Sequence, residues 1–287
     1  MKQLDFRRTI LPHLIAVLVF FLVTVIFFNP IFFKNRSLDQ YDIKQWKGSA
    51  QQAIDHREET GDELLWTTSM FGGMPSYLVE LDWNDDIVTT TKIVMALGLP
   101  HPVRNIFAAF LSYYILLLAF RVRPWLAIGG ALAFGLSSYM LIGLGAGHNA
   151  RIGAIAFMPL VIAGIHICLR RNRWVGFGLT TLAVALQLRE NHLQITYYLL
   201  FIIATYGIVS FIGAIRAGEL KPFAISAALL FLAAIIGLGT FYGKFWAISE
   251  YSQYSMRGVS ELEADQNAGE NTSGLKRDYA FEYSAGI

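Results

Sequence analysis

Long apolar stretches separated by short polar connections dominate the pattern of this chain. Strands of a membrane barrel would alternate apolar and polar positions, and these stretches do not, so we expect them to be helices. A helix needs about 20 residues to cross roughly 30 Å of hydrocarbon. Seven stretches approach that length: residues 10–28, 104–120, 125–143, 152–169, 174–188, 193–215 and 222–243. The pattern predicts an all-α integral membrane protein with about seven transmembrane helices.

The first apolar stretch is followed by a large polar loop, residues 29–103. Within it, Ile43 and Trp46 begin a series of apolar positions at helical spacing, with polar residues between them. Such a series predicts an amphipathic helix lying at the membrane surface. Further along, Gly72-Gly73 permits backbone conformations that other residues avoid, which predicts a tight turn. We therefore expect interfacial structure in this loop.

Composition supports membrane insertion and sets the expected orientation. The chain is 55% hydrophobic and 15% charged, with a mean hydropathy of +0.46, which is too apolar for an ordinary soluble domain. With the N terminus in the cytoplasm, the inner segments hold ten basic residues against two acidic ones. The net charge of the whole chain is only +2, so the outer segments are then net negative. The positive-inside rule favours this arrangement.

Two regions follow from this organisation. Residues 1–243 form the predicted transmembrane domain, with residues 29–103 as its large outer loop. Residues 244–287 are polar and are expected to face outward, as the start of a truncated region. The single cysteine, Cys168, lies inside an apolar stretch and excludes a disulfide within the chain.

Asp42 stands at the expected boundary between membrane and water. Followed by Gln45, it matches a capping box, in which the aspartate accepts hydrogen bonds from the first turn of a helix. A carboxylate at this level could equally take part in chemistry on a membrane-bound substrate. The residues alone leave both interpretations open, and one aspartate can serve both purposes.

Two polar turns are expected at the same boundary. In the first, a helix ends near Gly147 and Asn149 is the expected N-cap of the next helix, which leaves His148 and Arg151 projecting where a phosphate or sugar could be met. The second follows the short fifth apolar stretch and contains Arg189, Glu190, Asn191, His192 and Gln194. If that cluster is recessed, it must face protein or a wet cavity. A solvated turn is the alternative.

An acidic group in the outer loop is a weaker candidate for a metal site. Asp82, Asp85 and Asp86 lie close together, but the segment lacks the glycine and closing glutamate of a calcium loop. A solvated acidic surface is the preferred interpretation.

Several segments, taken in order, resemble the YfhO family of bacterial membrane proteins. They are the Asp42-x-x-Gln45 loop, Trp66–Pro75, Gly147–Asn149, Asn191–Gln194 with Thr196–Tyr198, and Glu250–Gly258. The likeness rests on their order and spacing over essentially the whole chain, although family members are typically much longer. That family is similar to the C-type (GT-C) glycosyltransferases, multi-span enzymes that use a polyprenyl-phosphate-linked sugar and a catalytic carboxylate in the first outer loop.

The resemblance implies a multi-pass glycosyltransferase of the bacterial cytoplasmic membrane. It would transfer a sugar from a polyprenyl-phosphate donor to an envelope glycan or lipid acceptor on the outer face, with Asp42 as the base and no nucleic-acid partner. A divalent cation is left open. The substrate-binding residues that it implies are Gln45, His148, Asn149, Arg151, Arg189, Glu190, Asn191, His192, Gln194 and Arg257.

Two other classes of protein compete with this interpretation. A transporter or flippase is expected to show inverted repeats or helices interrupted at mid-membrane, and neither is visible in the sequence. A non-catalytic subunit that assists envelope assembly is the other alternative. It should tolerate replacement of Asp42 by asparagine but not disruption of helix packing.

Overall fold

The computed structural model describes residue 6, residues 10–80 and residues 86–254, which are mostly helical. The chain divides into two compact units: residues 1–241, here called the helical unit, and residues 242–287, of which α13 (Tyr242–Ser252) is described. The elements of the helical unit are α2 (Leu11–Phe27), α3 (Asn29–Phe33), α4 (Tyr41–Thr60), β1 (Trp66–Thr67), β2 (Met74–Pro75), η1 (Ser76–Leu78), α5 (Ile87–Met95), α6 (Arg104–Ala119), α7 (Pro124–Gly135), α8 (Ser138–Ala146), α9 (Asn149–Arg170), α10 (Arg173–Arg189), α11 (Leu193–Ala217) and α12 (Leu220–Gly239).

Each of the seven apolar stretches forms a helix, but seven membrane spans are not supported. By length and composition, three described helices could cross a membrane: α9, α11 and α12. The pair α7 and α8, bent by 41° at a short break, would be a fourth if it counts as one span. α2 and α10 have 17 residues each and α6 has 16, which is below the length of about 20 that a span needs. The count of seven is therefore not supported, because three of the helices are too short and the stretch 125–143 is divided between α7 and α8.

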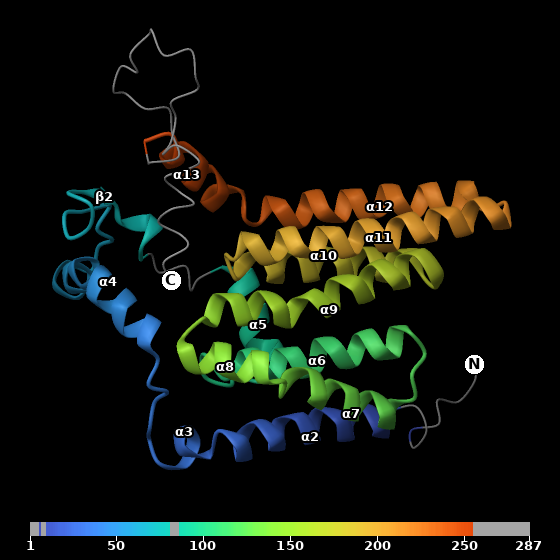
Figure 1. The fold of residues 1–287 in the computed structure, drawn as a ribbon, viewed down its shortest axis with the longest axis horizontal. Helices are drawn as coiled ribbons and strands as arrows, with labels where there is room; N and C mark the ends of the chain where they lie inside the picture. Colours follow the sequence, from blue (N-terminus) through green and yellow to red (C-terminus); the bar gives the residue numbers. More distant parts are fainter. Residues whose placement is uncertain (1–5, 7–9, 81–85, 255–287) are drawn as a thin grey trace, which may run out of the picture. The chain divides into compact units, whose positions relative to one another are not determined.

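α9 lies at the centre of the helical unit, between α6 and α10, while α12 packs on α10 and α2 packs on α6 and α7 (Figure 1). Small residues allow α9 and α10 to approach closely. A Cβ atom at Gly176 would overlap the backbone of Cys168, and one at Gly164 would come within 2.8 Å of the backbone nitrogen of Thr180. Close packing of this kind is common between membrane helices.

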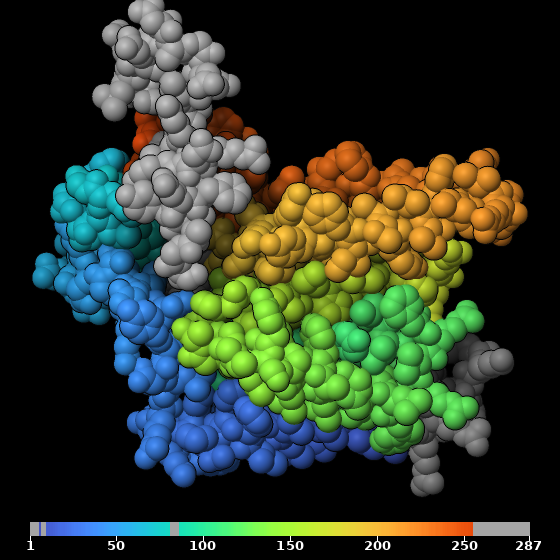
Figure 2. Space-filling view, in the orientation of Figure 1, coloured from blue at the N-terminus to red at the C-terminus, as the bar shows by residue number. Residues whose placement is uncertain are grey.

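The candidate spans differ in how much of their surface the protein covers. Within its most apolar window, 67% of α9 is buried, against 17% for α11 and for α12. Large apolar side chains such as Val209 and Phe231 stay exposed on these two outer helices, which lie at the surface of the helical unit (Figure 2). Apolar surface on this scale needs an apolar neighbour. A membrane would provide it.

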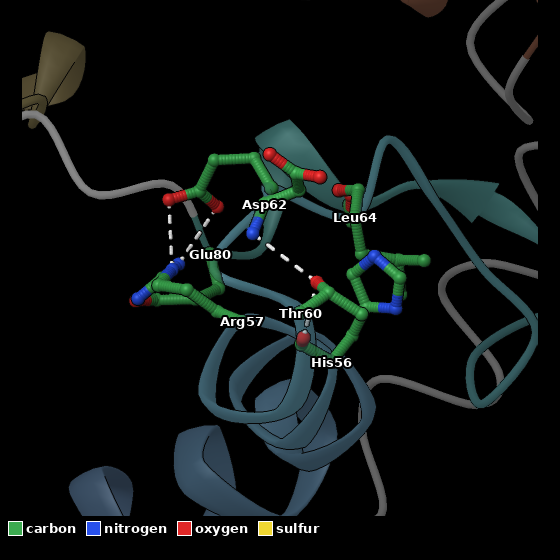
Figure 3. A network of polar contacts seen from close by, with 8 residues as sticks. His56, Arg57, Thr60, Asp62, Leu64 and Glu80 are labelled. Atoms are coloured by element: carbon green, nitrogen blue, oxygen red, sulfur yellow. Dashed lines mark hydrogen bonds and ion pairs between the residues drawn. The ribbon is translucent and has the colours of Figure 1, made fainter.

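The helix predicted from Asp42 onward is confirmed as α4, and the polar loop that follows is tied to its end. Arg57 of α4 forms ion pairs with Glu63 (2.7 Å) and Glu80 (3.3 Å), and the Asp62 backbone N–H donates to the Thr60 hydroxyl (3.1 Å) (Figure 3). These contacts close the polar loop on itself beyond the C terminus of α4. The arrangement fixes the loop without using Asp42 at the other end of the helix.

The tight turn predicted at Gly72-Gly73 is also confirmed. It joins β1 and β2, which pair antiparallel with Trp66 opposite Pro75. Gly73 has φ +132°, and a Cβ atom there would meet the Trp66 indole at 2.8 Å. Only glycine fits this combination of backbone angle and close approach.

Candidate functional site

Asp42 lies in the first turn of α4 and does not cap it. The N-cap is Gln40, and no side chain caps the helix; Gln45 donates instead to the Tyr41 hydroxyl (2.9 Å). The predicted capping box is therefore wrong, because the helix starts two residues earlier than the Asp-x-x-Gln pattern suggested. An acidic residue in a first turn still gains from the partial positive charge of the helix N terminus. Its carboxylate remains available for other contacts.

That carboxylate meets the turn between α8 and α9. His148 Nε2 lies 2.9 Å from Asp42 Oδ2, and Arg151 Nη2 contacts His148 Nδ1 on the opposite side of the ring. A guanidinium group can only donate, so Nδ1 accepts and the ring proton sits on Nε2, which donates to Asp42. Arg151 is itself held over the Tyr139 ring at 5.5 Å, within cation–π range. His148 therefore fixes the orientation of the carboxylate.

A buried cluster of three amides places α4 against this turn. Gln40 Nε2 donates to Leu144 O (2.6 Å) and to Asn149 Oδ1 (2.8 Å), while Asn149 Nδ2 donates back to Gln40 Oε1 (3.2 Å). Asn105 Nδ2 of α6 donates to Asn149 O (3.0 Å). All three amide residues are at most 6% exposed. Among the described residues the Asn105 Oδ1 has no partner, but the hydrogen bonds between Gln40 and Asn149 are buried and reciprocal, and such bonds favour one arrangement over others.

Asn149 was predicted to be both the N-cap of the next helix and a substrate-binding residue. The N-cap of α9 is His148, again without a side-chain cap, and the Asn149 amide is occupied by Gln40. The N-cap was assigned to the wrong residue because, after the helix end at Gly147, either His148 or Asn149 could begin the next helix. Gly147 has φ +102°, and a Cβ atom there would lie 3.1 Å from Asp42 Cβ. A side chain at 147 would push Asp42 away.

An open cavity of about 970 Å³ lies beside Asp42. Asp42 is not one of its lining residues, but three that are, Gln40, Ile43 and Gly147, are neighbours of Asp42. The charged residues that line it are Arg36, Lys44, Lys47, Lys92, Arg104, Arg189 and Glu190. Six cations thus surround the cavity with one carboxylate among them. Charges of one sign around a cleft concentrate their field within it and attract anions.

The end of α10 contributes two of these charges, each held by α5. Arg189 Nε donates to Asp86 Oδ2 and to the Thr89 hydroxyl, both at 2.9 Å. Asp86 is the N-cap of α5, so this member of the acidic group has a structural contact; Asp82 and Asp85 lie outside the described residues. Arg189 and Glu190 both line the cavity, and Glu190 is 8% exposed, while the depth of the cluster in a membrane stays a prediction.

Glu190 is the acidic member of the cavity wall. It pairs with Lys92 of α5 (2.5 Å), and its Oε2 lies directly against Gly153 of α9, where any Cβ atom would collide with it. Arg104 has no such ion pair, and its Nε is buried without a hydrogen-bond partner in the described part of the chain. Burial lowers the pKa of the half-buried Arg104, and the charge of Glu190 offsets only part of this shift, so an anion that reaches Arg104 would stabilise it.

Burial lowers the pKa of two histidines of this region, and only His101 lines the cavity. Burial lowers the pKa of His101 to about 4, and the positive charges of Lys92 and Arg104 contribute to the shift. The side chain of His101 lines the cavity and is open to solvent there, so the burial reflects protein on its other sides. Burial also lowers the pKa of His192, and nearby Arg151 and His148 lower it further.

Three predicted site residues, Asn191, Gln194 and Arg257, form no described contact with Asp42. Gln194 donates to Tyr198 (2.7 Å), and Asn191 is an exposed residue with φ +54° in the turn before α11. Arg257 lies outside the described residues.

Sequence reasoning missed five residues of this region: Gln40, Lys92, His101, Asn105 and Arg104. Their charge did not single out the two cations. Lys92 and Arg104 are two of the 13 basic residues that remain outside when ten of the 23 in the chain lie inside.

Among the described residues, no group of three or more histidine, cysteine, aspartate or glutamate side chains could hold a metal ion. Comparison with family models, with curated proteins and with solved structures found no significant match for this chain. Membership of the YfhO family therefore stays a prediction from the motifs.

Proposed function

We propose that this chain is a GT-C-like glycosyltransferase of a bacterial cytoplasmic membrane, with its N terminus inside and the Asp42 site at the outer face. It takes a sugar from a polyprenyl-phosphate donor and gives it to an envelope glycan or lipid. The observation that carries the proposal is the oriented carboxylate of Asp42, whose neighbours Gln40, Ile43 and Gly147 line a cationic cavity. The motif resemblance and the charge pattern of the segments support it.

The proposed reaction uses Asp42 as a general base. The carboxylate removes the proton of an acceptor hydroxyl as that oxygen forms a bond to the anomeric carbon of the donor sugar. The bond between this carbon and the phosphate oxygen breaks, and the lipid phosphate leaves with the electron pair. His148 acts as a positioning residue, because its Nε2–H holds one carboxylate oxygen and leaves the other, Oδ1, to the acceptor.

The cationic cavity suits the other half of this reaction. A sugar phosphodiester carries one negative charge, and the phosphate that leaves gains a second. Fixed positive groups stabilise charge that develops during a reaction without having to reorganise. Lys92 is held in place by Glu190, and Arg104 forms no ion pair with a described residue, so one cation is positioned and the other is available to meet the leaving phosphate.

The test compares two aspartates of α4 in cells that depend on the longest available form of the gene. Asp42→Asn removes the base, whereas Asp55→Asn, a matched control, changes an exposed carboxylate that only accepts from Gln51 (2.6 Å). Sugar content of the envelope polymers is measured by mass spectrometry at equal membrane abundance of each variant. We expect one sugar decoration to disappear with Asp42→Asn and to persist with Asp55→Asn.

Full rescue by Asp42→Asn would overturn the proposal. In that case the protein would act without proton transfer at Asp42, as expected of a non-catalytic assembly subunit. Loss of the decoration with both variants would point to a general defect in folding or insertion of α4, and would remove the support for Asp42 as the base.

A further inference from the structure

A second cavity lies at the opposite end of α9. It has a volume of about 200 Å³, and its walls come from the ends of α9, α10, α11 and α12. α9 rises about 1.5 Å per residue, so its 22 residues separate this cavity from the Asp42 end by roughly 30 Å. The two cavities share no lining residue. The second one therefore has no part in the proposed transfer reaction.

The charge around this second cavity is positive. Its charged lining residues are Arg170, Arg171, Arg173 and Glu219. Arg171 donates to Leu118 O at the end of α6 (3.2 Å), while Arg170 and Arg173 form no ion pair with any described residue. The Arg170 guanidinium lies over Gly213, 3.6 Å from where a Cβ atom would stand, so the absence of a side chain there admits it.

Two serines with little exposed surface line the same cavity. Ser210 of α11 is 3% exposed and Ser226 of α12 is 5% exposed. Neither hydroxyl is among the buried side-chain atoms that lack a partner in the described part of the chain, so each stays accessible where its serine lines the cavity. Each hydroxyl can therefore donate to an oxygen-rich ligand that enters the cavity.

The helix ends at this cavity do not determine whether it favours a positively or a negatively charged ligand. α10 and α12 begin at this cavity, which favours an anion, while α9 and α11 end there, which favours a cation. Since these contributions oppose each other, the arginines determine that the ligand is an anion. Paired arginines are well suited to phosphate, because the guanidinium group can donate two parallel hydrogen bonds.

We propose that this cavity binds the phosphate of an anionic phospholipid. Its mouth continues into apolar surface: Phe223 and Ala214 line the wall, and Ile212 and Ile215 lie exposed on the same stretch of α11. An acyl chain can follow this surface once its headgroup is held, whereas a free phosphate ion would leave it uncovered. Basic pockets between membrane helices are a known way of recognising anionic lipid headgroups.

The experiment uses the full chain, purified in dodecyl maltoside and stripped of lipid. Native mass spectrometry measures the binding of two lipids, the anionic dioleoylphosphatidylglycerol and the neutral dioleoylphosphatidylcholine. It also measures how far inorganic phosphate competes with the anionic lipid. The double variant Arg170→Gln/Arg173→Gln is compared with Arg123→Gln/Arg216→Gln, which removes two exposed arginines outside the cavity. Ser210→Ala tests a hydroxyl while keeping every charge.

We expect the cavity variant to lose roughly tenfold or more in affinity for the anionic lipid, and the control variant to change less than about threefold. Ser210→Ala should lower the affinity by a smaller factor of about three.

Equal losses in both double variants, or equal binding of the neutral lipid, would show general surface attraction and overturn the proposal. So would inorganic phosphate that competes at the same concentration as the lipid, because it would identify a free-anion site. An unchanged affinity in Ser210→Ala would overturn it even if the cavity variant failed to fold.

Discussion

Both ends of α9 carry a cavity with more basic than acidic side chains, yet the carboxylates at the two ends are held differently. At one end, Asp42 accepts from His148, which is fixed in turn by Arg151, and buried amides set the position of the whole helix start. At the other, Glu219 lines the cavity without any hydrogen bond or ion pair to its carboxylate among the described residues.

Because of this difference, both ends of α9 can bind an anion, but only one holds a carboxylate in a way that suits proton transfer. Positive charge and a hollow are sufficient to collect an anion, and both ends have them. Proton transfer also needs a base held within hydrogen-bond reach of its target, and only the Asp42 end has a supporting set of side chains that could hold one. The predictions below test whether the two ends are as independent and as different as this comparison requires.

The largest expected effect concerns Arg104, the unpaired cation of the Asp42 end. In Arg104→Gln we expect sugar transfer by the purified protein to fall by about 10²-fold, because a positive charge available to the leaving phosphate is lost. Affinity for phosphatidylglycerol at the far cavity should stay unchanged. Arg123→Gln, an exposed arginine outside both cavities, serves as control. A normal transfer rate in Arg104→Gln would contradict the assigned role of the cation.

Next comes the amide cluster that positions α4. Gln40→Leu leaves the buried Asn149 amide without its partner, and we expect a loss of about 1–3 kcal/mol in the free energy of unfolding. Gln51→Leu, at an exposed position on the same helix, should change it by less than about 0.5 kcal/mol. Denaturant titrations of both variants measure this. Equal stability of the two variants would mean that the cluster does not hold α4 in place.

A smaller effect is expected from Gly153→Ala. The added methyl group collides with the Glu190 carboxylate, which is the movable end of a flexible side chain, so the carboxylate should leave Lys92 while the fold persists. With its counter-ion displaced, the cavity should bind a short-chain polyprenyl phosphate about threefold to tenfold more tightly. Gly145→Ala, where the methyl group meets nothing within 4 Å, is the matched control. Weaker binding in Gly153→Ala would show that Glu190 assists the anion.

The smallest effect is a dependence of this binding on pH. His101 has a pKa of about 4, lowered from 6.5, so it is uncharged at pH 7. An anion in the cavity offsets the charges of Lys92 and Arg104 and raises that pKa, so binding takes up a proton and affinity should increase as pH falls from about 6.5 towards 4. In His101→Gln, the increase in affinity across this pH range should be about threefold smaller than in the wild-type protein. An identical pH profile in both proteins would remove His101 from the cavity's electrostatics.

Much of the fold could be predicted because helices in apolar runs depend on local pattern. All seven runs are helical, and the α4 helix and the Gly72-Gly73 turn lie where their residues predicted. The number of spans was not predictable in the same way. Where a helix stops within an apolar run depends on local breaks such as the one at residues 136–137, between α7 and α8, and a hydropathy window passes over such breaks.

For the site, the sequence pointed to Asp42, His148 and Arg151 individually, and the structure places them in contact. Their partners could not be foreseen, because they depend on long-range packing. Lys92 meets Glu190 from almost a hundred residues away, and nothing in either local segment encodes the approach of α5 to the end of α10. The capping prediction failed for a local reason: Gln40, a residue with no strong capping preference, begins the helix.

The hydrogen bonds between Gln40 and Asn149 span 109 residues, and this separation has a consequence for the newly made protein. The ribosome adds about 5–20 residues each second, so the start of α4 emerges roughly 5–20 s before the residue that will hold it. During that interval Asp42 has neither His148 nor the α8–α9 turn beside it. The site is therefore assembled only after half of the chain has been synthesised, and it is absent from every shorter nascent chain.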